Sequence, residues 1–91
     1  KINIMSTIKK QQLPKWFNGE LYEEGATVRN RFSGEECELN NIELSMYDFV
    51  MGSTMVLEMA GGYKHTSVDL LRKGLDWFRI NNPSAYMTLL D

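Results

Sequence analysis

Histidine and cysteine often supply nucleophiles and metal ligands, and each occurs once in this sequence, as His65 and Cys37. The single copies exclude a two-histidine metal site, a cysteine-rich metal site and a disulfide bond within the chain. Cys37 and His65 could form a nucleophile–base pair. However, the pattern around Cys37 predicts the inward face of a β-hairpin, where free cysteine usually packs as a small apolar residue. We expect His65 to be an exposed loop residue or to help cap a helix.

Phosphate-binding and acid–base patterns are also weak. Gly61-Gly62 precedes a predicted helix, but the sequence matches neither G-x-G-x-x-G nor G-x-x-x-x-G-K-[ST], so the pair is better interpreted as a helix terminator. Twelve acidic residues could supply paired carboxylates, yet most occupy exposed alternate positions or face arginines. A chain of 91 residues has little room for a catalytic pocket. We therefore expect no enzymatic activity, no cofactor, no identifiable small-molecule substrate and no tightly bound metal.

Charge is distributed unevenly, although the net charge is only −2. Residues 1–19 carry four lysines and no acid, whereas residues 20–58 carry nine acids against two arginines. A basic segment attracts phosphate and an acidic one repels it. Length and composition predict a single small globular domain over residues 13–91, preceded by a flexible basic arm over residues 1–12. No run approaches the roughly 18 apolar residues of a membrane span, so we expect no membrane partner.

A β-hairpin is the clearest local structure in the sequence. Ser33-Gly34 is a turn signal, and a two-residue loop there sets Arg29 opposite Glu38 and Arg31 opposite Glu36. The inward face of this hairpin would carry Val28, Phe32, Cys37 and Leu39.

Three helices are expected after the hairpin, over residues 41–60, 67–81 and 83–90. Asn40-x-x-Glu43 resembles a capping box, and Asn82 can cap the last helix with Pro83 in its first turn. The predicted fold class is α+β, with a short antiparallel β-hairpin or a three-stranded meander followed by three helices. The predicted core is Val28, Leu39, Met46, Phe49, Val50, Val56, Leu71, Leu75 and Phe78.

The helix predicted over residues 41–60 is apolar on two opposite faces. A surface helix needs only one apolar stripe, so the second face must be covered by the same chain or by a partner. Methionine suits a partner surface because it is flexible and polarisable. We therefore expect this face to bind a protein partner, either a second copy in a homodimer or another protein. Residues 83–91 or 13–17 could instead cover it in the monomer. This methionine stripe consists of Leu44, Met51, Met55 and Met59.

Nucleic-acid binding is the alternative function. The three C-terminal helices could form a helix-turn-helix-like unit, with Trp77 and Phe78 stacking on bases if they are exposed. The pI of about 5.4 is far from the basic value typical of such domains, and Asp69 and Asp76 interrupt the basic surface. This function therefore ranks second. Its phosphate contacts would be Lys9, Lys10, Lys15, Lys64, Arg72, Lys73 and Arg79.

Four segments resemble small uncharacterised proteins of marine bacteriophages: RNRFSGE at 29–35, MYDF at 46–49, KGLDWF at 73–78 and NNPSAY at 81–86. The resemblance covers about residues 13–91, and its pattern more often has proline where this chain has Arg31. It implies a phage accessory or host-takeover factor in the cytoplasm of a bacterial host or associated with the virion. It brings no activity, cofactor or binding residue with it.

Overall fold

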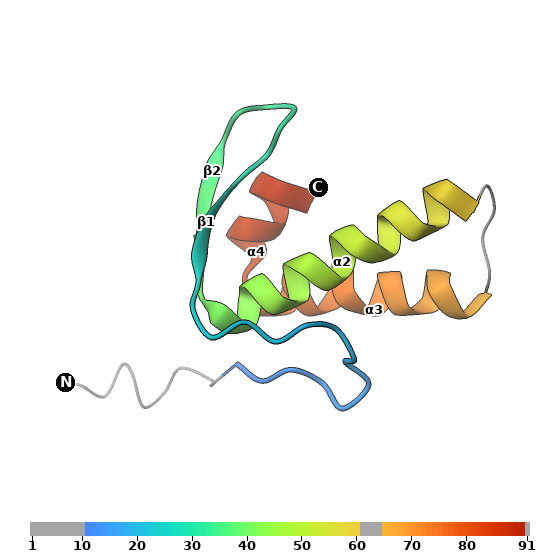
Figure 1. Ribbon diagram of the computed structural model, residues 1–91. Coiled ribbons are helices and arrows are strands. Elements are labelled where there is room, and N and C mark those ends of the chain that lie inside the picture. Colours follow the sequence, from blue (N-terminus) through green and yellow to red (C-terminus); the bar gives the residue numbers. More distant parts are fainter. Residues whose placement is uncertain (1–10, 61–64, 91) are drawn as a thin grey trace.

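The computed structural model describes residues 11–60 and 65–90 of the chain (Figure 1). Its order of elements confirms the predicted α+β class, a hairpin followed by helices. Within residues 11–25 there are turns but no strand, so the sheet described has two strands rather than three. The elements are β1 (Ala26–Arg29), β2 (Glu36–Leu39), α2 (Asn41–Ala60), α3 (His65–Asn81), α4 (Pro83–Ala85) and the π-helical turn η1 (Tyr86–Leu90).

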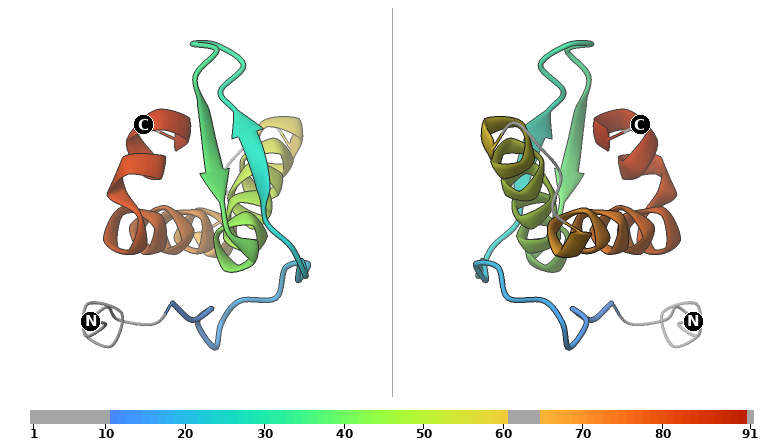
Figure 2. Two further views of the ribbon diagram at one scale, coloured as in Figure 1. Left: turned by 90° about the vertical axis from the view of Figure 1, so that its left-hand side faces the viewer. Right: turned by 90° about the vertical axis from the view of Figure 1, so that its right-hand side faces the viewer.

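The helices form a layer on which the hairpin stands (Figure 2). α2 and α3 run side by side in opposite directions, and the hairpin rises between α2 and the α4–η1 segment. The segment before β1 crosses the helices on the side away from the hairpin loop (Figure 1). Among the described helices, none is long and apolar enough to cross a membrane.

The hairpin has a different register from the predicted one. β1 and β2 pair antiparallel with Arg29 opposite Glu36, and the Arg29 and Glu36 side chains form an ion pair at 3.1 Å. The loop comprises residues 31–34 because the Asn30 side chain accepts hydrogen bonds from the N–H groups of Phe32 and Ser33. The predicted pairs of Arg29 with Glu38 and Arg31 with Glu36 are therefore wrong.

The register shift changes the loop more than the faces of the strands. A shift of two residues preserves the alternation of side chains, so Leu39 is buried while Val28 and Cys37 are half-buried against the core. Phe32, predicted on this inward face, lies in the loop instead and is 89% exposed. Gly34 closes the loop with a φ of +83°, a conformation that glycine adopts readily.

The capping box at the start of α2 is confirmed and extends into a larger network. Asn40 Oδ1 accepts from the Glu43 N–H at 2.8 Å, while Glu43 Oε1 accepts from the Asn40 N–H at 3.0 Å. Glu43 Oε2 accepts two further bonds, from Gln11 Nε2 at 2.8 Å and Asn82 Nδ2 at 2.9 Å. Glu43 is 6% exposed and thus joins the N-terminal segment, α2 and the start of α4.

The hydrophobic core lies between α2, α3, the hairpin and the C-terminal turn. α2 and α3 approach closely at Gly74, where an added β-carbon would lie 2.8 Å from Val50 Cγ2. Asn82 caps α4 by accepting from the Ala85 N–H, with Pro83 in the first turn as predicted. Eight of the nine predicted core residues are buried or half-buried, but Val56 is 59% exposed. The buried apolar residues are Leu39, Met46, Val50, Leu57, Trp77, Phe78, Ala85 and Leu89.

The N-terminal segment packs on the helices through its aromatic residues. The ring centroids of Trp16 and Phe17 lie 5.7 and 5.4 Å from that of Phe49. Trp77 Nε1 donates to the Gln12 carbonyl at 3.0 Å. Gln12 ends the arm predicted over residues 1–12, so at least this end is attached to the domain; residues 1–10 lie outside those the structure describes.

Candidate protein-interaction surface

The methionine stripe of α2 is covered at its N-terminal end and exposed at its C-terminal end. Leu44 is half-buried and packs against the core. Met51 is half-buried and lines a hollow together with Leu89 of η1. Met55 and Met59 are 58% and 80% exposed. The structure thus divides the four predicted residues into two half-buried and two exposed ones.

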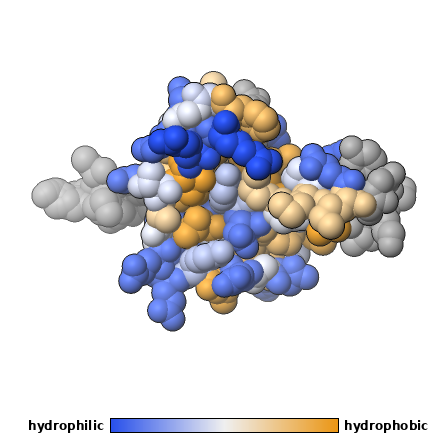
Figure 3. All heavy atoms as spheres, turned by 45° about the horizontal axis from the view of Figure 1, so that its top comes forward, coloured by the Kyte–Doolittle hydropathy of each residue, from blue (hydrophilic) through white to orange (hydrophobic). Residues whose placement is uncertain are grey.

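Two residues that the sequence did not assign to this surface extend its exposed half. Val56 is exposed beside Met55, and a β-carbon added to Gly52 would meet none of the described atoms within 4 Å. The positions i, i+3, i+4 and i+7 share one face of a helix. We call Gly52, Met55, Val56 and Met59 the α2 seam. Figure 3 shows hydrophobic side chains over this C-terminal half of α2.

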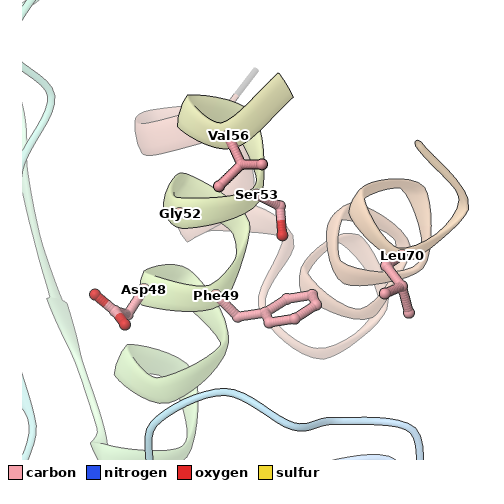
Figure 4. Close-up of a pocket in the computed structure, with 6 residues that line it drawn as sticks. All are labelled: Asp48, Phe49, Gly52, Ser53, Val56 and Leu70. Carbon is pink, nitrogen blue, oxygen red and sulfur yellow. The ribbon is translucent and has the colours of Figure 1, made fainter. Parts of the chain in front are cut away.

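A hollow of about 330 Å³ explains why Val56 is exposed. The Phe49 ring points from α2 toward α3, and Leu70 lines the hollow from the side of α3 (Figure 4). Gly52, Ser53 and Val56 line it from the next turns of α2. α3 therefore does not close over Val56, and the hollow opens directly beside the α2 seam.

The rim of this hollow carries one carboxylate. Asp48 lines the hollow. Burial raises the pKa of the Tyr22 hydroxyl, and the negative charges of Asp48 and Glu20 raise this pKa further. The surface around the seam therefore combines an apolar centre with an acidic edge.

The one cysteine has the environment of a structural residue. Cys37 is half-buried on the inward face of the hairpin, as predicted, and its Sγ lies 3.8 Å from the Glu38 carbonyl oxygen. Burial raises the pKa of the thiol, and the charges of Glu43 and Glu38 raise this pKa further. A raised pKa disfavours the nucleophilic thiolate. The His65 side chain lies outside the described part of the structure, as does the Gly61-Gly62 pair.

Metal ligands do not gather in the described part of the chain. Within residues 11–60 and 65–90, there is no group of three histidine, cysteine, aspartate or glutamate side chains that could hold a metal ion.

The residues of the alternative nucleic-acid site fall into two groups. Lys15, Arg72, Lys73 and Arg79 are exposed, whereas Lys9, Lys10 and Lys64 lie outside the described residues.

Two observations on α3 give no support to nucleic-acid recognition. Arg79 forms an ion pair with Asp76, and its guanidinium lies 5.6 Å from the centroid of the Tyr86 ring. Trp77 and Phe78 are only 7% and 0% exposed, so their rings cannot stack on bases.

Comparison with known proteins finds no matching family model, no matching curated protein and no matching solved structure. The functional assignment therefore depends on the geometry of the chain's own surface, in particular the α2 seam and the hollow beside it.

Proposed function

We propose that this chain is a non-enzymatic protein-interaction module and that the α2 seam binds a second copy of the chain. The observation that carries the proposal is the exposure of three large apolar side chains on successive turns of one helix. Met55, Val56 and Met59 are 58%, 59% and 80% exposed. Single exposed apolar residues are common on soluble proteins, whereas a contiguous apolar surface typically marks an interaction site.

The seam is complementary to itself when two copies of α2 cross in antiparallel directions. Aligning Met55 with Val56 of the other copy sets Met59 opposite Gly52, so the most exposed side chain of the seam faces the position without one. The same alignment sets Glu58 opposite Ser53 rather than opposite another acid. A parallel alignment would place the two Glu58 carboxylates together, where like charges repel. An antiparallel contact is also isologous, the commonest symmetry among dimers.

The hollow beside the seam gives Met59 of the second copy a place to pack. Gly52 lines this hollow of about 330 Å³ together with Phe49 and Leu70. A hollow of this volume is large enough to take a methionine side chain in place of water. Insertion of Met59 would thus exchange water for apolar contacts.

We expect the dimer to be weak. Seven residue steps along a helix span about 10 Å at 1.5 Å per residue. A contact of this length buries much less surface than the roughly 1,600 Å² of a standard stable interface. Dimerisation should therefore depend on concentration and should be sensitive to a single charge in the seam.

The biological setting is a separate part of the proposal. The resemblance to marine bacteriophage proteins favours an accessory or host-takeover factor, acting in the cytoplasm of a bacterial host or with the virion.

The test is the solution mass of the wild type and two lysine variants, measured by light scattering over a range of concentrations. Met59→Lys places a charge in the seam, while Ile80→Lys makes the same kind of change on α3 at a residue that is 78% exposed. We expect the masses of the wild type and Ile80→Lys to rise together toward a dimer, and Met59→Lys to remain monomeric. A monomeric wild type at every concentration, or association of Met59→Lys equal to that of the wild type, would refute the proposal.

A further inference from the structure

A second hollow, of about 230 Å³, lies where the hairpin loop meets α2 and η1. It is separate from the α2–α3 hollow and is bounded by a different set of side chains. We call it the hairpin hollow. Its lining comprises Arg29, Asn30, Arg31, Phe32, Tyr47, Met51 and Leu89.

The hairpin hollow has an apolar floor and a cationic, aromatic rim. Leu89 is buried and Met51 is half-buried, so the floor is provided by η1 and α2. Phe32 on the rim is 89% exposed, and the Arg31 guanidinium carbon lies 5.6 Å from the centroid of its ring. Arginine, tyrosine, phenylalanine and methionine are the residue types enriched at protein interfaces.

The two arginines of the hollow differ in their charge partners. Arg29 forms an ion pair with Glu36 across the strands at 3.1 Å. Among the described residues, no carboxylate lies within 4.0 Å of the Arg31 guanidinium nitrogens. Arg31 therefore offers a planar pair of donors that matches a carboxylate supplied from outside.

The loop that carries Arg31 and Phe32 is held in place before any partner arrives. Asn30 Oδ1 accepts from the Phe32 N–H at 2.8 Å, and Asn30 Nδ2 donates to the Thr88 carbonyl at 2.9 Å. The Gly34 N–H also donates to the Asn30 carbonyl at 2.7 Å. The bond to Thr88 joins the loop to η1, and the other two hold the loop itself together, so binding requires little further ordering of the backbone.

We infer that the hairpin hollow binds a peptide segment of another protein that presents an apolar side chain next to a carboxylate. The apolar side chain occupies the floor beside Met51 and Leu89, and the carboxylate pairs with Arg31. The hollow, of about 230 Å³, is large enough to take one large apolar side chain such as that of phenylalanine or leucine. This inference does not depend on the α2 seam.

The experiment selects peptides from a random displayed library on the immobilised wild-type chain. We expect the enriched peptides to share an aspartate or glutamate beside a large apolar residue. Binding of one enriched, fluorescently labelled peptide is then measured by polarisation against Arg31→Gln, Phe32→Ser and the control Arg72→Gln. All three positions are exposed, so the variants should fold.

Loss of the charge-assisted bonds in Arg31→Gln should weaken binding roughly ten- to a hundredfold, and Arg72→Gln should leave it unchanged. A selection that yields no peptide with this pairing, or equal binding by wild type and Arg31→Gln, overturns the inference. Binding of a free carboxylate, such as acetate, with the affinity of the peptide would also overturn it. Met59→Lys should not alter peptide binding, which separates this site from the α2 seam.

Discussion

Replacement of Glu43 by alanine should destabilise the fold more than any other single loss of a carboxylate among the described residues. Glu43 accepts hydrogen bonds from the Asn40 N–H, Gln11 Nε2 and Asn82 Nδ2. Alanine removes both oxygens and leaves these three donors without their acceptor. Because Glu43 is 6% exposed, water cannot replace its oxygens without opening the contact between the N-terminal segment, α2 and α4.

The magnitude follows from those three bonds. A hydrogen bond to a charged group contributes about 1.5–3 kcal/mol, and a neutral one contributes about 1 kcal/mol. Because Asn40 is exposed and Gln11 is half-buried, we take about 1 kcal/mol for each of the three bonds, which gives a loss of about 3 kcal/mol. For a domain of this size, such a loss lowers the melting temperature by roughly 12–24 °C.

Urea unfolding followed by circular dichroism measures this loss, with Glu58→Ala as the matched control. Glu58 is also a glutamate of α2, but it is exposed. We therefore expect Glu58→Ala to change the free energy of unfolding by no more than about 0.5 kcal/mol. If Glu43→Ala costs less than about 1 kcal/mol, or no more than Glu58→Ala, the network does not hold these elements together.

Three further predictions concern stability and ionisation. Gly52→Ala should raise the free energy of unfolding by about 1 kcal/mol, because alanine has the higher helix propensity. Gly74→Ala should lower it by about 1–3 kcal/mol, because the added methyl group would clash with Val50 of α2. Thermal melts that rank the two variants in the opposite order would contradict the packing described. Burial raises the pKa of Tyr47, and the positive charge of Arg31 lowers it. Arg31→Gln should therefore raise this pKa further in an ultraviolet titration that uses Tyr47→Phe as the reference. An unchanged or lower pKa would place Arg31 away from the Tyr47 ring. Met55→Lys should fold with a stability within about 0.5 kcal/mol of the wild type in urea, since Met55 is 58% exposed, and a larger loss would make it a core residue.

The hairpin illustrates which part of the fold the sequence could predict. The alternation of apolar residues indicated the inward face of the strands, and Cys37 and Leu39 do face the core. The register depended on the Asn30 side chain, which bonds two loop N–H groups and lengthens the loop. Charge pairing across the strands gave no sign of these bonds, so it was not enough to choose the register.

The candidate surface illustrates what required the structure. Periodicity identified two apolar faces on α2, but it assigned Val56 to the core because Val56 lies beside core positions on the helical wheel. In the structure α3 approaches α2 closely at Gly74, whereas an open hollow lies between Val56 and Leu70. The partners of Glu43 were hidden for a similar reason, since Gln11 and Asn82 are distant in the sequence. Local patterns predicted the cap but not the tertiary contacts that surround it.

The most direct test of the central claim is a nuclear magnetic resonance experiment on a mixture of labelled and unlabelled chains at high concentration. An isotope filter then reports only contacts between two copies. We predict an intermolecular Overhauser effect between the Met59 methyl group of one copy and the Gly52 α-protons of the other, with a second one between Met55 and Val56. Intermolecular signals that connect other surfaces, or none from Met59 at concentrations where the chain associates, would contradict the account.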